Sequence, residues 1–219
     1  MQMRFKGYPR TVRRDQIVGS VAHNPFWDRA SGVRYMKLRL RNGEAALVSR
    51  TKDKPGTLRP TASRVRLALF SIIASHLVGA RVLDLFAGSG ALGIEALERG
   101  SASVDFVERS RKIAAALTAN LFRLGLGDRT RVFTLRAEKA IEKLDDGYDL
   151  IFMDPPYNYQ ELTGLVEKIT AGPLIRRTGH LVVEHFKGRV LPEEVGGFSV
   201  EKARRYGDTA ITIYGPGGF

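Results

Sequence analysis

The sequence has no cysteine among its 219 residues, and it has no long apolar run. Without cysteine there is no disulfide and no zinc site built on thiolates. No apolar stretch approaches the roughly 18 residues that a membrane-spanning helix needs, and no hydrophobic signal region follows the first residues. The four histidines are scattered along the chain, so we predict no metal site. These absences favour a soluble, cytoplasmic, globular protein.

The excess of positive charge is confined to the first part of the chain. The formal net charge is +12, and residues 1–66 hold 16 of the 35 basic residues but only four of the 23 acidic ones. The other 153 residues carry 19 basic and 19 acidic side chains and are neutral overall. A basic segment ahead of a neutral body favours a polyanionic substrate. We expect two parts, a basic arm over residues 1–56 and a catalytic domain over residues 57–219.

The arm contains a pattern typical of a β-hairpin. Apolar and basic residues are interleaved over residues 33–41, and Asn42-Gly43 precedes a second short apolar segment at 44–48. Asn-Gly between two such segments is the strongest short-range hairpin signal. Phe26 and Trp27, which come earlier in the arm, would pack a small core or stack on unpaired bases.

A linker and a helix join the arm to the catalytic domain. Pro55-Gly56 marks the linker, and apolar residues recur at helical spacing over residues 65–73. Either Thr61 or Ser63 is expected to cap this helix. Cations are slightly unfavourable at a helix N-terminus, so basic residues there indicate a bound anion, most simply a phosphate. The basic residues expected near this end are Arg59, Arg64 and Arg66.

A glycine-rich turn follows the first apolar segment of the catalytic domain. That segment runs from Val82 to Phe86, and Gly88, Gly90 and Gly93 come before a helical pattern. Glycines allow positive φ and let a ligand approach the backbone closely, so strand, turn and helix N-terminus indicate a nucleotide site. The G-x-G-x-x-G spacing suits NAD and S-adenosylmethionine alike.

Two acidic residues follow the next two strand-like segments. Glu108 comes directly after residues 103–107 and lies twenty residues after Gly88, where a carboxylate can accept hydrogen bonds from both ribose hydroxyls. Glu138 comes after residues 131–135, where an acid could meet the adenine amine. The predicted cofactor-binding residues are Asp84, Phe86, Gly88, Gly90, Glu108 and Glu138.

The tetrapeptide Asp154-Pro155-Pro156-Tyr157 follows the apolar segment Tyr148–Met153 and indicates the chemistry. The exocyclic amine of a nucleobase is a poor nucleophile, because its lone pair is delocalised into the ring. A carboxylate and the next backbone carbonyl could accept hydrogen bonds from both N–H groups of the amine. Prolines, with φ of about −65°, would hold these acceptors still. The tyrosine could stack on a flipped base. All four residues are predicted to be catalytic; the alternative is a strand-ending acid before a rigid turn.

Strands and helices alternate through the rest of the chain. We predict helices over residues 109–123 and 159–170, and a strand over 179–186. Two final strands at 198–202 and 209–214 are joined so closely that only antiparallel pairing is possible. The fold class is therefore α/β, with a doubly wound Rossmann-like sheet and a C-terminal antiparallel hairpin. Such a hairpin is typical of a class I methyltransferase and unusual in a dinucleotide dehydrogenase.

Several short stretches between Thr57 and the C-terminus form a recognisable combination: Leu58–Thr61, Arg64–Arg66 and Ala68–Phe70, then Asp84–Gly100, Asp154–Tyr157, Val183–His185 and Tyr206–Ala210. In these stretches the sequence resembles the bacterial 16S rRNA guanine-N2 methyltransferases of the RsmD family. The resemblance implies S-adenosylmethionine as the methyl donor and a guanine of 16S rRNA or of the small ribosomal subunit as the acceptor. It also implies that Asp154, Pro155 and Tyr157 hold this guanine.

The resemblance places Arg59 and Arg64 on the substrate side. The residues predicted to bind RNA are Arg34, Lys37, Arg39, Arg59, Arg64 and Arg66. We expect a monomer that requires neither a metal nor a membrane. Three other readings use parts of the same sequence: a DNA adenine-N6 methyltransferase with the same tetrapeptide, an NAD-dependent oxidoreductase with the same glycines, and a non-catalytic RNA-binding module.

Overall fold

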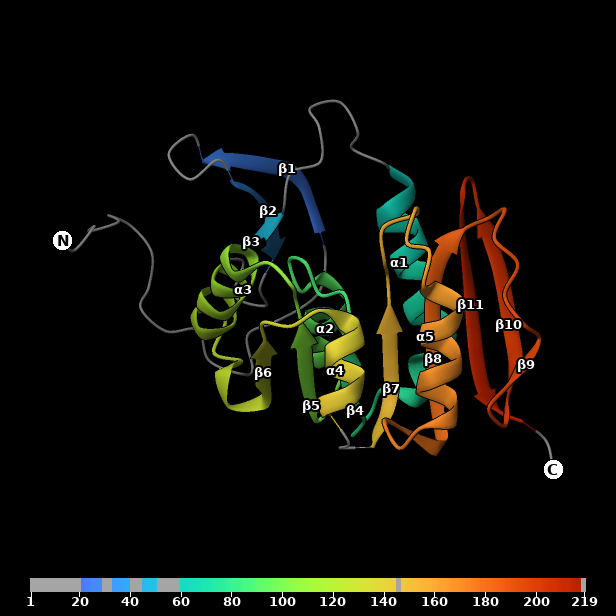
Figure 1. Cartoon of the computed structure of the whole chain (residues 1–219). Coiled ribbons are helices and arrows are strands. Elements are labelled where there is room, and N and C mark those ends of the chain that lie inside the picture. The colour runs from blue at the N-terminus through green and yellow to red at the C-terminus, as the bar shows by residue number, and fades with distance from the viewer. Residues whose placement is uncertain (1–20, 29–32, 40–44, 51–59, 145–146, 218–219) are drawn as a thin grey trace.

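The computed structural model describes residues 21–28, 33–39, 45–50, 60–144 and 147–217 (Figure 1). Its main feature is an eight-stranded sheet with the strand order β6-β5-β4-β7-β8-β11-β10-β9. The strands are β4 (Arg81–Asp84), β5 (Ser103–Val107), β6 (Thr130–Phe133), β7 (Tyr148–Met153), β8 (Ile175–Phe186), β9 (Glu194–Val195), β10 (Phe198–Tyr206) and β11 (Thr209–Pro216).

The sheet is parallel from β6 to β8 and antiparallel from β8 to β9. β4 pairs in parallel with both β5 and β7, and β7 pairs in parallel with β8. β11 is antiparallel to β8 on one side and to β10 on the other. The last strand of the chain thus lies inside the sheet, which an all-parallel dinucleotide-binding sheet does not show. The predicted fold class, with its C-terminal antiparallel hairpin, is confirmed.

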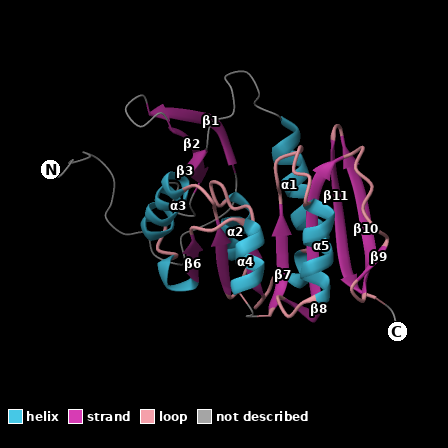
Figure 2. Cartoon of the chain, viewed as in Figure 1, coloured by secondary structure: helices cyan, strands magenta, loops and turns pink. Residues whose placement is uncertain are grey.

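Helices cover both faces of this sheet (Figure 2). They are α1 (Pro60–Ile72), α2 (Ala91–Glu98), α3 (Arg111–Arg123), α4 (Ala137–Lys143) and α5 (Leu162–Ala171), with short 3-10 turns η1 (Ala74–His76) and η2 (Gly127–Arg129). Successive residues of a strand point to opposite faces, so neighbours in β4 join different cores. Val82 packs with α1, α2 and α3, whereas Leu83 packs with α4 and α5.

Several element bounds differ from the predictions. β5 and β7 have the predicted bounds, but α1 begins at Pro60, before both expected capping residues, so the predicted cap at Thr61 or Ser63 is wrong. Proline suits the first helical turn because the N–H that it lacks would have no intrahelical acceptor there. Helix α4 was not predicted, because its seven residues span too few turns for a clear apolar period.

The N-terminal part forms a separate antiparallel sheet of three strands, in the order β1-β2-β3. The strands are β1 (Val21–Asp28), β2 (Val33–Arg39) and β3 (Ala45–Arg50). The predicted hairpin is confirmed as β2 and β3, although its Asn42-Gly43 turn and the Pro55-Gly56 linker lie outside the described residues. β1 was missed because its register with β2 shifts between Ala22 and Phe26, which interrupts the alternation. In the described part of the chain no helix has the length and apolarity that crossing a membrane requires.

Candidate active site

Three acidic side chains meet at one edge of the sheet because of its topology. Asp84 ends β4, Glu108 follows β5 and Asp154 follows β7, and these three strands are parallel neighbours. The carboxyl ends of parallel strands lie at the same edge, and β4 stands where the order of the strands reverses. Open α/β sheets bind their ligands at this switch point.

The glycine turn after β4 has two different physical roles. Gly88 and Gly90 have φ values of +52° and +80°, which favour glycine at both positions. A methyl group added at Gly88 would meet no side chain, so a ligand can approach the backbone there. Added methyl groups at Gly90 and Gly93 would clash with Leu117 and Phe106, respectively. These two glycines therefore allow α2 and α3 to pack closely on β5.

Glu108 connects the glycine turn to the beginning of α3. Its Oε2 accepts a hydrogen bond of 3.1 Å from the backbone N–H of Gly88, and its Oε1 accepts one of 2.7 Å from the N–H of Ser110. The side chain is half-buried, and a carboxylate offers about four acceptor positions. Glu108 therefore holds the loop in place while keeping acceptor capacity for a ligand.

Asp84 is a buried carboxylate with incomplete hydrogen bonding. Only 1% of the residue is exposed, and its Oδ2 accepts a 3.3 Å hydrogen bond from the N–H of Gly93. Its Oδ1 has no hydrogen-bond partner among the described residues. Burial raises the pKa of Asp84 to about 7, and the charges of Asp154 and Glu108 add to the increase. A cation beside Asp84 would relieve both the desolvation and the repulsion.

Asp154 reaches solvent at the start of the Asp-Pro-Pro-Tyr turn. The protein around it still removes part of its hydration, which raises the pKa of Asp154 to about 6. At neutral pH the side chain is therefore largely an anionic acceptor. Within the turn, Pro155 is buried and Pro156 is exposed, and the Pro156 carbonyl accepts a 2.9 Å hydrogen bond from the N–H of Tyr159.

The side chain of Tyr157 is hydrogen-bonded to the C-terminal hairpin. Its hydroxyl forms a hydrogen bond with the hydroxyl of Thr209, the first residue of β11. The ring of Phe186, which is 42% exposed at the end of β8, has its centroid 6.2 Å from that of Tyr157. The hairpin thus orients the tyrosine, and a second aromatic ring lies beside it. Neither Thr209 nor Phe186 was predicted as part of the site.

Glu138, Tyr159 and Phe86 form one group next to the glycine turn. The Tyr159 hydroxyl donates a hydrogen bond to Glu138, which lowers the pKa of the Glu138 carboxyl. The Tyr159 ring contacts Phe86 edge to face, with centroids 5.3 Å apart. Tyr159 was predicted as the first residue of a helix over 159–170 and not as part of the site; α5 begins only at Leu162, so Tyr159 lies in the loop before it. Contact of Glu138 with an adenine stays a prediction, since its carboxylate already has a protein partner.

The structure leaves the predicted RNA-binding residues untested. Arg66 is half-buried, and its charge opposes the burial that raises the pKa of Glu98 to about 7. The side chains of the others lie outside the described part of the molecule: Arg34, Lys37 and Arg39 belong to β2, Arg64 to α1, and Arg59 to the segment before α1. Of the four histidines, His76 and His180 lie together although the sequence separates them.

The strand order with its inserted antiparallel β11, the glycine turn and the acid after the second strand of the parallel sheet define a class I methyltransferase. A family model described as Conserved hypothetical protein 95 matches residues 49–215. The chain belongs to this family, the RsmD family of rRNA methyltransferases.

Individual relatives agree with this assignment. The Bacillus subtilis protein YlbH is 39% identical over 159 residues, which cover 71% of this chain and 86% of YlbH. Ribosomal RNA small subunit methyltransferase D of Escherichia coli K12 is 33% identical, covering 74% of this chain and 81% of its own length. The solved structure of yhhF from Escherichia coli has a TM-score of 0.69 at 30% identity and covers 80% of this chain and 93% of that one.

Proposed function

We propose that this protein transfers the methyl group of S-adenosylmethionine to the exocyclic N2 amine of a guanine in 16S rRNA. The observation that carries the proposal is the position of Asp154: it follows β7 at the edge where Asp84 and Glu108 also lie. The relatives named as small-subunit rRNA methyltransferases support the choice of substrate.

The residues at this edge fit S-adenosylmethionine, which is a nucleoside with a positively charged sulfonium and ammonium group. Glu108 keeps acceptor capacity for the ribose hydroxyls, and Gly88 leaves its backbone open to the ligand. The buried Oδ1 of Asp84, unpartnered among the described residues, would be satisfied next to the amino-acid portion. When bound, S-adenosylmethionine supplies an electrophilic methyl group.

The acceptor side activates the amine by hydrogen bonding. Asp154 accepts one N–H of the guanine amine, and the backbone carbonyl of Pro155 accepts the other, so the lone pair is localised on nitrogen and directed at the methyl carbon. Proximity and in-line orientation then supply most of the rate enhancement. Tyr157, held by Thr209, stacks on the base and fixes its plane. The extra proton leaves the nitrogen after transfer, with Asp154 or water as the acceptor.

The test is transfer of labelled methyl to unmethylated small-subunit particles and to deproteinised 16S rRNA, followed by nucleoside analysis. We expect the label in N2-methylguanosine. Label in N6-methyladenosine would replace the substrate assignment while keeping the acceptor geometry. An adenine-containing DNA duplex, offered in parallel, tests the DNA alternative directly. Absence of label from every acceptor, with S-adenosylmethionine still bound, would contradict the proposed function.

We expect the affinity for S-adenosylmethionine to rise with pH up to about pH 7. The pKa of Asp84 is raised to about 7, so this carboxyl is mainly protonated below that pH and must lose its proton to face a cation. For one proton the loss of affinity is at most about tenfold per pH unit below the pKa. Calorimetry between about pH 5.5 and 8, in two buffers of different ionisation enthalpy, measures the affinity and the released proton. An affinity independent of pH would show that Asp84 does not face the cationic part.

Deletion of residues 1–54 should flatten the salt dependence of RNA binding. This segment contains much of the basic excess, and each phosphate contact that is lost reduces the slope of log K against log salt by roughly 0.7 to 0.9. Filter binding to 16S rRNA over a series of KCl concentrations measures the slope. Circular dichroism melting of the truncated protein controls for folding, because β3 lies next to α3. An unchanged slope would show that the arm does not contact RNA.

A further inference from the structure

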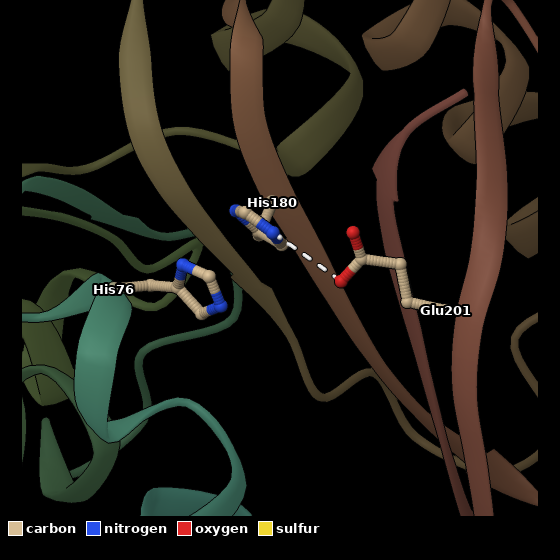
Figure 3. A group of neighbouring side chains, drawn as sticks. All are labelled: His76, His180 and Glu201. Carbon is tan, nitrogen blue, oxygen red and sulfur yellow. Dashed lines mark ion pairs between the residues drawn. The ribbon is translucent and has the colours of Figure 1, made fainter. Parts of the chain in front are cut away.

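Two histidines and a glutamate from distant parts of the sequence gather beside the sheet (Figure 3). His76 ends η1, His180 lies in β8 and Glu201 lies in β10. One potential ligand atom from each side chain lies within 4.8 Å of the other two. No such group was predicted from the sequence, because the three residues have no local spacing that relates them.

The distances are close to those around a bound transition metal. Zinc binds histidine nitrogen and carboxylate oxygen at about 2.0–2.2 Å, so two ligands of a tetrahedral ion lie roughly 3.3–3.6 Å apart. Nε2 of His180 and Oε2 of Glu201 are 3.3 Å apart. His180 is held by the sheet, with 7% of its surface exposed, whereas His76 is half-buried and Glu201 is exposed. The two more exposed side chains can therefore move to complete the coordination around a fixed nitrogen.

The packing of the group also favours neutral imidazoles as ligands. The rings of His76 and His180 stack with centroids 3.8 Å apart and planes 30° from parallel. Two imidazolium cations at this distance would repel each other, so the stack favours uncharged rings, whose nitrogens can carry lone pairs. A metal–nitrogen bond lies in the plane of its imidazole ring, so the half-buried His76 ring would turn out of the stack to bind the same ion as His180. Gly215 leaves the room that the Glu201 side chain occupies, since a methyl group at this glycine would clash with it.

We propose that His76, His180 and Glu201 bind one divalent transition-metal ion, with zinc as the best match. Two imidazole nitrogens and one carboxylate oxygen suit zinc or cobalt, whereas magnesium and calcium prefer sites made of oxygen ligands. A fourth position would be filled by water. The proposal is independent of the methyl-transfer reaction and adds a cofactor-type site that the family assignment does not include.

The site lies away from the catalytic edge of the sheet and links separate elements. His180 pairs with Leu150 on β7, four residues before Asp154, which corresponds to about 13 Å along the strand. A metal ion here would join the turn after α1 to β8 and to the hairpin strand β10. Because Thr209 at the start of β11 orients Tyr157, the metal would stabilise the hairpin that supports the acceptor turn. Its role is structural.

The test begins with full-length protein that has been treated with a chelator and dialysed. Calorimetric titration with ZnCl₂ should show one saturable site with a dissociation constant in the micromolar range or below. Titration with CoCl₂ should give the visible absorption of a tetrahedral cobalt ion with nitrogen and oxygen ligands, which purely structural stacking of the histidines would not produce. The absence of saturable zinc binding at about 100 µM would overturn the proposal.

Variants assign the site to these residues. His76→Ala and Glu201→Gln should each weaken zinc binding more than about tenfold, since loss of even an outer partner of a ligand costs roughly 10- to 100-fold. Glu193→Gln, which changes an exposed glutamate outside the group, is the matched control and should bind zinc normally. Glu201 is exposed, so Glu201→Gln should fold even if His76→Ala is destabilised. Unchanged zinc affinity in the Gln variant would place the ion elsewhere and refute the assignment.

Discussion

Substitution of Asp154 by alanine should lower the rate of methyl transfer by roughly a thousandfold or more while leaving S-adenosylmethionine binding largely intact. The side chain is an anionic carboxylate at the start of the turn, with a pKa raised to about 6, and in the proposed mechanism it accepts one N–H of the guanine amine. Removal of a positioned proton-accepting group typically costs about 10²- to 10⁴-fold in rate. Because the interaction strengthens as the amine attacks, the loss should appear in kcat more than in KM.

The measurement is single-turnover transfer of labelled methyl at saturating rRNA, with calorimetry for the cofactor. Asp154→Asn keeps one side-chain oxygen as an acceptor and should retain more activity than Asp154→Ala. The matched control is Glu161→Ala, which removes an exposed carboxylate a few residues after the same turn. Turnover by Asp154→Ala within about threefold of the unmodified protein would remove the acceptor role from this residue.

Substitution of Glu108 by alanine should weaken S-adenosylmethionine binding by about 10- to 100-fold without changing affinity for RNA. Two losses combine: the proposed hydrogen bonds from the ribose hydroxyls are removed, and the N–H groups of Gly88 and Ser110 lose their common acceptor. A hydrogen bond to a charged group contributes about 1.5–3 kcal/mol, and one such bond is sufficient for a tenfold effect. The glycine turn would also become less ordered.

Calorimetric titration with S-adenosylmethionine, together with filter binding to 16S rRNA, separates the two affinities. Glu108→Gln should be intermediate, because its amide keeps one oxygen but directs an NH₂ group at a backbone N–H. Glu142→Ala changes an exposed acid on α4 and serves as the control. If the cofactor affinity of Glu108→Ala is unchanged, another residue accepts the hydrogen bonds of the ribose hydroxyls.

Local sequence patterns were sufficient to predict most strands and helices of the catalytic domain. β5 and β7 were predicted with their observed bounds, because buried parallel strands are short, continuous apolar runs that end at polar residues. The terminal hairpin followed from the short connection between its strands. β8 begins at Ile175, earlier than predicted. Its early residues, Arg176 to Thr178, are exposed and polar, so they lack the apolar signal of a buried strand. β1 and α4 were not predicted. β1 is irregular and α4 is short, so neither has a sustained period of apolar residues.

The sequence by itself determined the class of fold, the glycine turn, the acids at the ends of three strands and the Asp-Pro-Pro-Tyr turn, because each is a short contiguous pattern with a direct physical meaning. Only the tertiary structure decided which distant side chains meet them. Thr209 and Phe186 reach Tyr157 because β11 pairs with β8. Tyr159, in the loop after β7, meets Glu138, in the first turn of α4, because both follow strands that end at the same edge of the sheet. Pairing between strands brings together residues whose separation along the chain carries no signal of contact, and the group of His76, His180 and Glu201 arises for the same reason.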